Sequence, residues 1–439
     1  MDKLEKARDE IAKYDYIRFA LCDINGTSRG PVMHSRYAVK YLQGGLDLFE
    51  GTLLFGYNHE IVILPQDKGY HNGNVTLVPD LDTLRPIPWA GENTFKVAEV
   101  LCESRWKRDL SPQAACPRYV ARQQLKQLDD LGLQFYSGFE MEYFLFDAKT
   151  LTPVFTGKPY MCHQALNKWG KYVYKFDSQL KQSGIDVQKI HLEYSPGMFE
   201  AVMEPKFGID AADVAFNLKQ GLLELAEQNG VKASFISKLD VDDTGAGCHY
   251  SFSVLSKDTG ENAFYDVSST DNLTPMAKQW IAGILRHSKA LAALTSPTIN
   301  CYRRLHQPWA PGGIFWGIDD RDASLRAKNH GPTGTYLENR MPSGKSNPYI
   351  VMAATIAAGL DGVKNKLECP APGNLKNTEP LPKSLSEALK DLEDDKYMVD
   401  ALGHELISWF VKCKEVDIER FKCITDENEK SSYERKVYL

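Results

Sequence analysis

The chain lacks the features of membrane, nucleic-acid-binding and disulfide-stabilised proteins. No apolar run approaches the roughly 20 residues that a membrane-spanning helix needs, and the charged stretch 1–6 does not resemble a signal peptide. Lys and Arg number 52 against 58 Asp and Glu, so the basic excess typical of nucleic-acid or anionic-lipid binding is absent. The nine cysteines are odd in number and form no Cys-x-x-Cys pair, which predicts free thiols in a reducing compartment. We therefore expect a cytoplasmic protein with neither a membrane nor a nucleic-acid partner.

Length and periodicity predict more than one folding unit. A chain of 439 residues is long for a single hydrophobic core. The polar stretch 105–112 precedes an amphipathic pattern, so we place a domain boundary there. Helices are expected over 118–130, 210–228, 275–294 and 384–414, and the charged tail 425–436 is expected to be partly mobile.

Two glutamates lie on one face of an otherwise apolar predicted strand, 138–146. The strand period of two directs Glu140 and Glu142 to the same face, and Phe139 and Met141 to the other. The two side chains would lie about 7 Å apart or less. Burying an unpaired charge costs several kcal/mol, so a cation must lie beside them. That cation could be a bound metal ion or a pair of arginines; alternatively, the strand is amphipathic and this face is exposed to water.

Three further segments carry side chains of the same kind. A Pro-Gly turn at 196–197 would bring the glutamates on either side of it together. A glycine-rich stretch, 245–247, leads into a predicted strand with a polar inward face, and the segment 334–340 again has charged residues two positions apart. Each segment alone fits a structural ion pair, but four in one chain make that explanation weak. The residues are Glu193, Glu200, His249, Ser251, Ser253, Glu338 and Arg340.

Together the four segments supply five glutamates and one histidine. Oxygen-rich ligand sets with an occasional imidazole suit Mg²⁺ or Mn²⁺, whereas zinc prefers cysteine and histidine. Two such ions would hold phosphate oxygens between them. The sequence therefore predicts a site with at least two divalent cations.

These segments, in this order, resemble the glutamine synthetase family, in the class I type built as rings of long subunits. The resemblance runs from the start IRFALCDING at 17–26, through 77–84 and the four acidic or glycine-rich segments, to Asn347-Pro348-Tyr349 and the helix after it. It implies an α+β fold, with a small N-terminal β-grasp domain over 1–108. A large catalytic α/β domain with an antiparallel sheet would follow over 109–439.

The resemblance also implies a role for each site residue. Glu142, Glu193 and Glu200 match the family's tighter metal site, and Glu140, His249 and Glu338 match the second, which faces the nucleotide phosphates. Planar, permanently charged guanidinium groups suit the substrate carboxylate and the transferred phosphate. The matching arginines are Arg304, Arg321, Arg326 and Arg340, with Arg326, Ser251, Ser253 and Tyr336 on the nucleotide side.

The implied chemistry is amide formation through an acyl phosphate. The family transfers the γ-phosphoryl group of ATP to the side-chain carboxylate of glutamate, and an amine then displaces phosphate. The implied small-molecule partners are glutamate, ATP, and ammonia or a larger amine. The implied assembly is a homododecamer of two six-membered rings, with active sites between subunits.

The departures from the family pattern concern the amine and the nucleotide. Trp309 stands where ammonia-using members carry a flap glutamate, and branches that use larger amines also have an aromatic residue there. Glu50 stands where the family usually has an aspartate, an acidic residue that reaches from a neighbouring subunit into the active site and acts as a latch. On the nucleotide side, Ser251 replaces a histidine and Tyr336 an arginine. Each lost charge-assisted contact is worth about 1.5–3 kcal/mol, so ATP affinity falls unless Lys328 or Lys345 substitutes.

A second likeness, through 330–349 and 401–403, is to lengsin, the vertebrate lens branch of the family. That branch implies a catalytically inactive protein with a structural or chaperone-like role and, in that case, a cytoskeletal partner. Unlike the expected pattern of that branch, this chain keeps all six metal ligands. Two hypotheses therefore remain, a ligase of the glutamine synthetase type and a pseudoenzyme.

Overall fold

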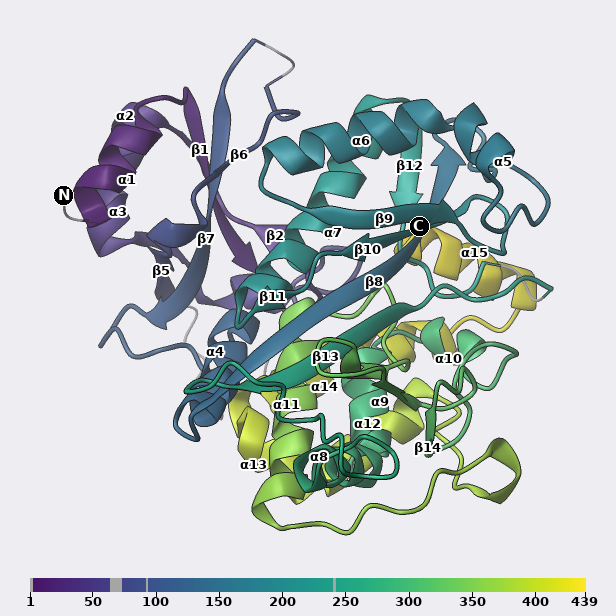
Figure 1. The fold of residues 1–439 in the computed structure, drawn as a ribbon. Helices are drawn as coiled ribbons and strands as arrows, with labels where there is room; N and C mark the ends of the chain where they lie inside the picture. Colours follow the sequence, from purple (N-terminus) through teal and green to yellow (C-terminus); the bar gives the residue numbers. More distant parts are fainter. Residues whose placement is uncertain (1–2, 64–72, 92–93, 240–241) are drawn as a thin grey trace.

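The computed structural model describes residues 3–63, 73–91, 94–239 and 242–439. Two sheets follow one another along the chain (Figure 1). The first sheet has the order β2-β1-β7-β5-β4, in which β1 and β7 pair in parallel and the other neighbours are antiparallel; β3 and β6 add to β1 and β7. Its strands are β1 (Tyr16–Cys22), β2 (Ser28–Arg29), β3 (Val32–His34), β4 (Leu46–Phe49), β5 (Asn74–Pro79), β6 (Arg85–Pro86) and β7 (Val97–Trp106).

The second sheet is larger and centres on the long strand β8. Its order is β14-β15-β16-β13-β8-β10-β9, antiparallel except for β14 and β15, with β11 and β12 also pairing with β8. Its strands are β8 (Leu133–Asp147), β9 (Val187–Leu192), β10 (Met198–Met203), β11 (Lys206–Phe207), β12 (Val231–Ser234), β13 (Cys248–Ser256), β14 (Trp316–Ile318), β15 (Leu325–Asn329) and β16 (Thr335–Asn339).

Helices lie on both sides of the second sheet. In Figure 1, α6 and α7 lie above it, and a larger group that includes α8, α11 and α12 lies below. The helices are α1 (Lys3–Ile11), α2 (Ser35–Ala38), α3 (Tyr41–Gly44), η1 (Glu50–Leu53), η3 (Leu81–Thr83), α4 (Pro117–Asp129), α5 (His163–Lys168), α6 (Gly170–Gln182), α7 (Asp210–Gln228), α8 (Pro275–Arg286), α9 (Ser288–Thr295), α10 (Cys301–Arg304), α11 (Pro348–Lys364), η4 (Leu375–Asn377), α12 (Leu385–Asp394), α13 (Lys396–Leu402), α14 (His404–Lys422) and α15 (Glu427–Tyr438).

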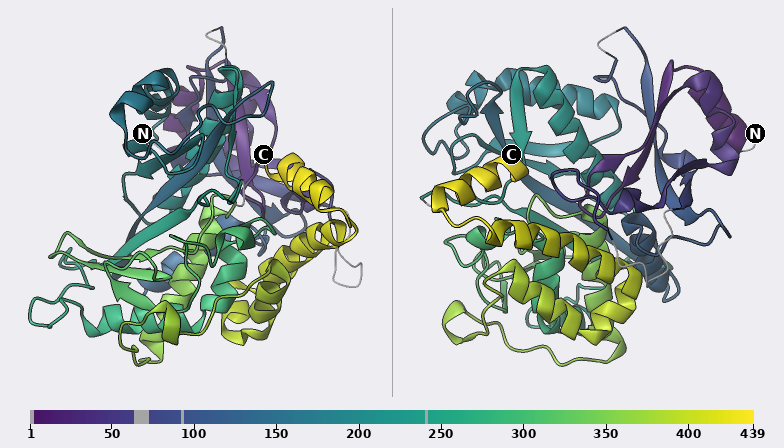
Figure 2. Two further views of the ribbon diagram at one scale, coloured as in Figure 1. Left: turned by 90° about the vertical axis from the view of Figure 1, so that its right-hand side faces the viewer. Right: turned by 180° about the vertical axis from the view of Figure 1, so that it is seen from behind.

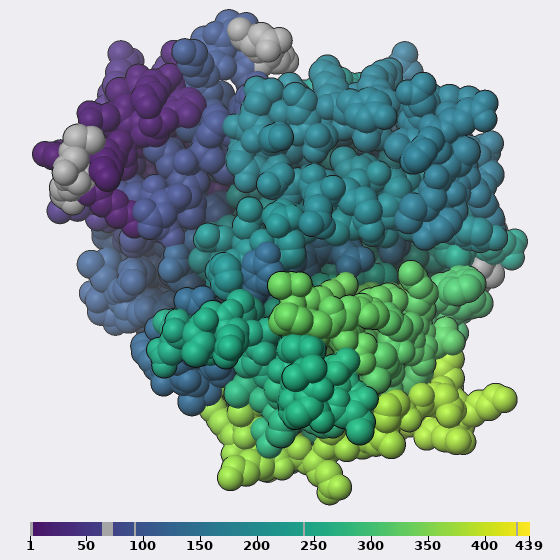
Figure 3. Space-filling view, in the orientation of Figure 1, coloured from purple at the N-terminus to yellow at the C-terminus, as the bar shows by residue number. Residues whose placement is uncertain are grey.

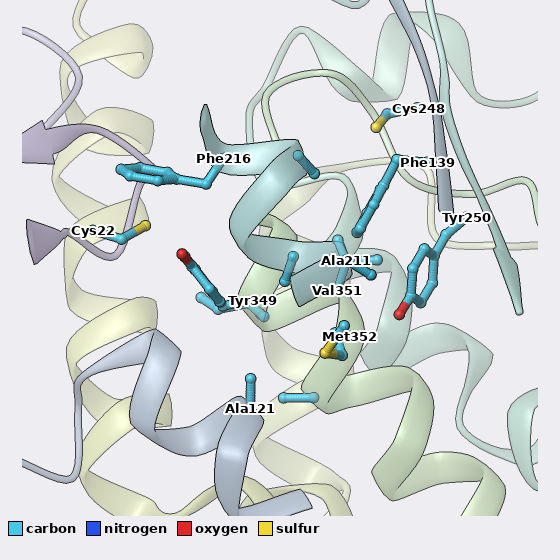
Figure 4. Close-up of a cluster of buried hydrophobic side chains, with 14 of the residues drawn as sticks. Cys22, Ala121, Phe139, Ala211, Phe216, Cys248, Tyr250, Tyr349, Val351 and Met352 are labelled. Atoms are coloured by element: carbon cyan, nitrogen blue, oxygen red, sulfur yellow. The ribbon is translucent and has the colours of Figure 1, made fainter. Parts of the chain in front are cut away.

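Helix α11 lies at the centre of the core that joins the two sheets. Nearly all its residues are buried, which is typical of a helix that is apolar on every side. The Asn347 side chain caps it by accepting from the backbone N–H of Tyr349, at 3.0 Å. Figure 4 shows Tyr349 near Phe216 of α7 and Cys22 of β1; the Tyr349 and Phe216 ring centroids lie 5.8 Å apart. The first sheet is thereby fixed against the scaffold of the second.

The predicted fold class is confirmed, as a small N-terminal β-rich part followed by a larger part with an antiparallel sheet. The division at residue 108 stays a prediction; the change of sheet falls between Trp106 and Leu133. The helices predicted over 118–130 and 210–228 correspond to α4 and α7. The single helix predicted over 275–294 is wrong, because α8 ends at Arg286 and α9 begins at Ser288. The tail 425–436 is mostly helix α15, whose end is buried.

No helix in the described ranges is long and apolar enough to cross a membrane. All nine cysteines lie within the described residues and are free thiols, as predicted.

Candidate active site

One cavity of about 640 Å³ collects the predicted metal ligands and the predicted arginines. In the space-filling view, a hollow separates the teal part of the surface from the green part, the two stretches of chain that line this cavity (Figure 3). Its walls include Glu140, Glu142, Glu193, Glu200, His249, Glu338, Arg304, Arg321, Arg326 and Arg340, together with Trp309, Tyr336 and Lys328.

The strand β8 directs Glu140 and Glu142 into this cavity, as the period of two predicts. In the ladder, Glu142 lies opposite Glu200 of β10, and Glu140 lies opposite His249 of β13. A backbone N–H from Gly247 donates to Glu142 Oε2 at 2.8 Å. The two central glutamates are thus held by neighbouring strands rather than by a mobile loop.

The predicted turn at 196–197 is confirmed as the connection between β9 and β10. Gly197 has φ +70°, and a Cβ there would lie 2.8 Å from the Leu145 carbonyl oxygen, so only glycine fits without strain. The turn places Glu193 and Glu200 around the ring of His191, whose Nδ1 and Nε2 lie 3.5 Å from a carboxylate oxygen of Glu193 and of Glu200, respectively.

His191 is a site residue that sequence reasoning missed. Its nitrogens and the two carboxylates offer ligand atoms within 4.8 Å of one another, close enough for one metal ion. The signal was available, since position 191 has the same strand parity as position 193.

The glycine-rich stretch before β13 makes room for Arg304. A Cβ at Gly245 would lie 2.6 Å from Arg304 Cγ, and one at Gly247 would lie 2.6 Å from its Nη2. The guanidinium is almost fully buried and donates to the backbone carbonyls of Arg340 at 3.0 Å and Met341 at 3.1 Å. The N–H groups of Arg304 therefore stabilise the backbone at Arg340 and Met341, and its positive charge lies near the glutamates of the cavity.

Two arginines hold Glu338, the predicted metal ligand on β16. Arg340 Nη1 donates to Glu338 Oε1 at 2.6 Å, and Arg326 Nη1 donates to Oε2 at 3.2 Å. His249 Nδ1 lies 3.4 Å from the same Oε1. Burial and the surrounding arginines lower the pKa of His249 well below its usual value, so the ring is neutral and able to act as a ligand.

The remaining carboxylates repel one another. Burial, together with the other glutamates, raises the pKa of Glu140 to about 7, that of Glu142 to about 7 and that of Glu193 to about 8. Burial would also raise the pKa of Glu200, but the hydrogen bond and charge of His191, together with the charge of Lys189, outweigh burial and lower this pKa. Carboxylates crowded in this way match a site for hard divalent cations.

The predicted amine side of the cavity carries exposed aromatic groups. Trp309 lines the cavity with 65% of its surface exposed, and it has φ +69°, the left-handed region that L-residues rarely adopt. Its backbone carbonyl accepts from Arg340 Nη2 at 3.4 Å. Arg321 also lines the cavity and is exposed. Tyr160 and Tyr194 also line the cavity and are 47% and 45% exposed.

The predicted nucleotide residues are only partly brought together. Tyr336 and Arg326 line the cavity, whereas Ser251 and Ser253 are outside its lining, and Ser251 Oγ donates to Glu140 at 3.4 Å. Of the two substitute cations, Lys328 lines the cavity and is ion-paired with Asp319. The suggestion that Lys345 substitutes is not supported, because its Nζ lies 5.9 Å from the Tyr438 ring centroid, outside the cavity lining.

Glu50 is the predicted residue that lies elsewhere. It begins the short helix η1, is 4% exposed and is not part of the lining of its own chain's cavity. A role as a latch would therefore require the cavity of a neighbouring subunit, and it stays a prediction.

Comparison with known proteins decides the family. The glutamine synthetase catalytic domain matches residues 114–433, which is most of the chain. The chain belongs to the glutamine synthetase family. Among its relatives, glutamine synthetase of Thermotoga maritima is 32% identical over 423 residues, covering 92% of this chain and 93% of that protein. Human lengsin is 30% identical over 460 residues, covering 100% of this chain and 85% of that protein.

Solved structures share the fold of this glutamine synthetase family member. A novel glutamine synthase homolog aligns with a TM-score of 0.86 at 23% identity, covering 97% of this chain and 99% of the other. The complex of GmaS with ADP aligns with a TM-score of 0.85 at 24% identity, covering 99% and 98%. The resemblance inferred from the sequence is thus confirmed at the level of family and fold.

Proposed function

We propose that the protein is an ATP-dependent carbon–nitrogen ligase that converts the side-chain carboxylate of glutamate into an amide. The observation that carries this proposal is that all six predicted metal ligands and all four predicted arginines line one cavity. The family relationship supports the same chemistry. Two divalent cations, Mg²⁺ or Mn²⁺, held by the six ligands would neutralise phosphate charge when bound.

The residues of the chain would do three things in this reaction. Arg321 and Arg340 would orient the substrate carboxylate and the phosphoryl group, since guanidinium groups bind such oxygens in a bidentate manner. Arg326 would contact the nucleotide phosphates as the matching family arginine does, and Lys328 would replace the histidine and arginine contacts that this chain lacks. Glu140, Glu142 and Glu193 would be fully ionised at neutral pH only with cations beside them, because burial and the neighbouring carboxylates raise their pKa.

We further propose an amine larger than ammonia as the acceptor. Trp309 offers no carboxylate to deprotonate ammonium at the flap position. Its exposed indole, with the half-exposed rings of Tyr160 and Tyr194, instead gives the cavity an apolar rim. Such a rim would gain free energy from covering the carbon chain of an acceptor.

The second candidate function is that of an inactive, lengsin-like assembly protein. Ser251 and Tyr336 favour it, because neither supplies the cation or imidazole that the family uses there. Lys328, which lines the cavity, is moreover held by Asp319. The two candidates differ in whether ATP turns over.

ADP release by the full-length oligomer separates them. The assay contains Mg²⁺ or Mn²⁺, glutamate, ATP and acceptors that run from ammonium through ethylamine to polyamines and aromatic amines. We expect amine-dependent turnover that is abolished by Glu142→Ala and retained by Glu227→Ala, which removes an exposed glutamate of α7. Silence with every amine, together with calorimetry that detects no ATP binding, would favour the assembly protein.

A further inference from the structure

The C-terminal helix α15 packs against the strand that carries the central glutamates. Phe144 and Phe146 follow Glu140 and Glu142 on the same face of β8. They form a small apolar cluster with Val437 and Tyr438, the last residues of α15. Both views of Figure 2 show α14 and α15, in yellow, along one side of the molecule. The glutamates of the site and the two phenylalanines therefore lie on one face of β8, and α15 covers the part of this face that carries the phenylalanines.

Hydrogen bonds fix the end of α15 in this position. The Tyr438 hydroxyl and the Tyr433 hydroxyl both donate to Asp417 of α14, the latter at 2.8 Å. The backbone carbonyl of Tyr438 accepts from Ser234 Oγ of β12 at 2.9 Å. Tyr438 is fully buried. Specific hydrogen bonds thus hold the end of α15 against two separate elements, α14 and β12.

Glu434 links this anchored helix to the base of the Trp309 loop, the segment 305–315 between α10 and β14. It is only 3% exposed; its Oε1 accepts from Arg303 Nε at 2.9 Å and lies 2.7 Å from Arg303 Nη2. Its Oε2 accepts from Asn300 Nδ2 at 2.6 Å. Asn300 and Arg303 are the residue before α10 and the residue immediately preceding Arg304.

Asn300 extends the link to a second wall of the cavity. Its side chain accepts from the backbone N–H of Lys238 at 2.9 Å and donates to the Lys238 carbonyl at 3.0 Å. Next to Lys238, the backbone carbonyl of Ser237 accepts from the N–H of Ala246 at 2.7 Å, beside Gly245, which lines the cavity. The Glu434 carboxylate is therefore hydrogen-bonded to residues that support two parts of the cavity lining. One part carries Arg304, and the other carries the glycine-rich stretch 245–247.

Close apolar packing does not account for this link. A cavity of about 300 Å³ lies between α15 and the loop base, with Arg303, Gln307, Ser431 and Glu434 among its lining residues. The connection between α15 and the loop base therefore depends on the hydrogen bonds of the charged Glu434 side chain. Such charge-assisted bonds are about twice as strong as neutral ones.

We propose that Glu434 is a positioning residue, through which α15 holds Arg304 and the Trp309 loop in the arrangement that the reaction needs. The coupling itself is a property of the fold; only its catalytic consequence rests on the proposed ligase function. Helix α15 is thereby part of the functional unit, although none of its described side chains lines the main cavity.

Hydrogen–deuterium exchange of the full-length protein tests the coupling without any assumption about activity. Glu434→Gln keeps the size of the side chain but removes its charge and one acceptor, so we expect about tenfold faster exchange over 301–311. Exchange over 133–143 of β8 should stay unchanged. Glu429→Gln, an exposed position on the same helix, is the matched control and should change neither segment. Unchanged exchange over 301–311 in Glu434→Gln would overturn the proposal.

A double-mutant cycle distinguishes loss of the contact between Glu434 and Arg303 from a general loss of stability. Arg303→Gln should reproduce the effect over 301–311, and the double variant should be no faster than either single one, because all three lack the same contact. Additive effects, or faster exchange throughout the chain, would show a merely structural role and overturn the proposal.

Kinetics then test the catalytic consequence. We expect Glu434→Gln to raise the KM for glutamate about tenfold while the KM for ATP stays unchanged. Unchanged KM for glutamate with faster exchange over 301–311 would reject the positioning role. No turnover by the unaltered protein would count against the proposed function alone, and the exchange result would still decide the coupling.

Discussion

The crowded carboxylates of the main cavity make an unusual prediction about the metal-free protein. Glu140, Glu142 and Glu193 have pKa values raised to about 7 or 8 in the folded state, above the ordinary value of 4.5. The folded state therefore binds more protons than the unfolded state between these values, and stability falls as the pH rises through them. Without metal, we expect a Tm that declines from pH 5 to pH 8.

Added Mn²⁺ should reverse that decline, because a cation favours the ionised carboxylates. The gain in Tm on adding metal should be largest at pH 8 and smallest at pH 5, as measured by differential scanning calorimetry. Glu140→Gln should flatten the metal-free profile. A Tm independent of pH in the metal-free protein, with an equal gain from metal at every pH, would contradict the assignment of these side chains to a cation site.

Single residues also show where sequence reasoning reached its limit. Strand parity was enough to direct Glu140 and Glu142 into one site, and the Pro-Gly turn was enough to join Glu193 and Glu200. His191 shares that parity but was not selected, because a lone histidine on a strand is common without any ligand role. The burial of Arg304 against backbone carbonyls was not accessible either, since it depends on loops distant in sequence.

Among the elements, helix boundaries failed where tertiary contacts interrupt a helical pattern. The pattern over 275–294 breaks at His287, whose ring binds Asp395 at 2.6 Å and Asp361 at 3.0 Å. The pattern over 384–414 contains three helices. Asp395 caps the start of α13, and Gly403, with φ +93°, separates α13 from α14. Local periodicity predicted helix correctly in both stretches, and long-range partners decided where each helix ends.

The packing of α11 against α8 gives a prediction at this scale. A Cβ at Gly359 would lie 1.9 Å from Trp280 Cε2, and Trp280 is fully buried, so the ring cannot move aside freely. We expect Gly359→Ala to lower the free energy of unfolding by about 1–3 kcal/mol, the usual effect of overpacking a core. Gly44→Ala, with no atom within 4 Å of the new Cβ, is the control. Equal stability of the two variants in urea unfolding would refute this packing.

For the whole molecule, the family resemblance predicts that Glu50 belongs to the active site of a neighbouring subunit. It does not line its own chain's cavity, so we propose that it completes the cavity of a neighbouring subunit in a ring, most simply a dodecamer. Each of Glu50→Ala and Glu142→Ala should then be inactive alone. In mixed oligomers of the two, about one quarter of the sites would combine an intact cavity with an intact neighbour and regain activity. No recovery on mixing would place each site within one subunit.

The proposed ligase reaction has one consequence that no simple ATP hydrolysis shares. When the acyl phosphate forms, an oxygen of the glutamate side chain becomes bonded to phosphorus, and it leaves with phosphate when the amine attacks. The decisive measurement is therefore mass spectrometry of phosphate released from ATP with glutamate labelled by ¹⁸O in its side-chain carboxylate. We predict one labelled oxygen in each phosphate, formed in step with the amide. Unlabelled phosphate, or no phosphate with any amine, would contradict the account.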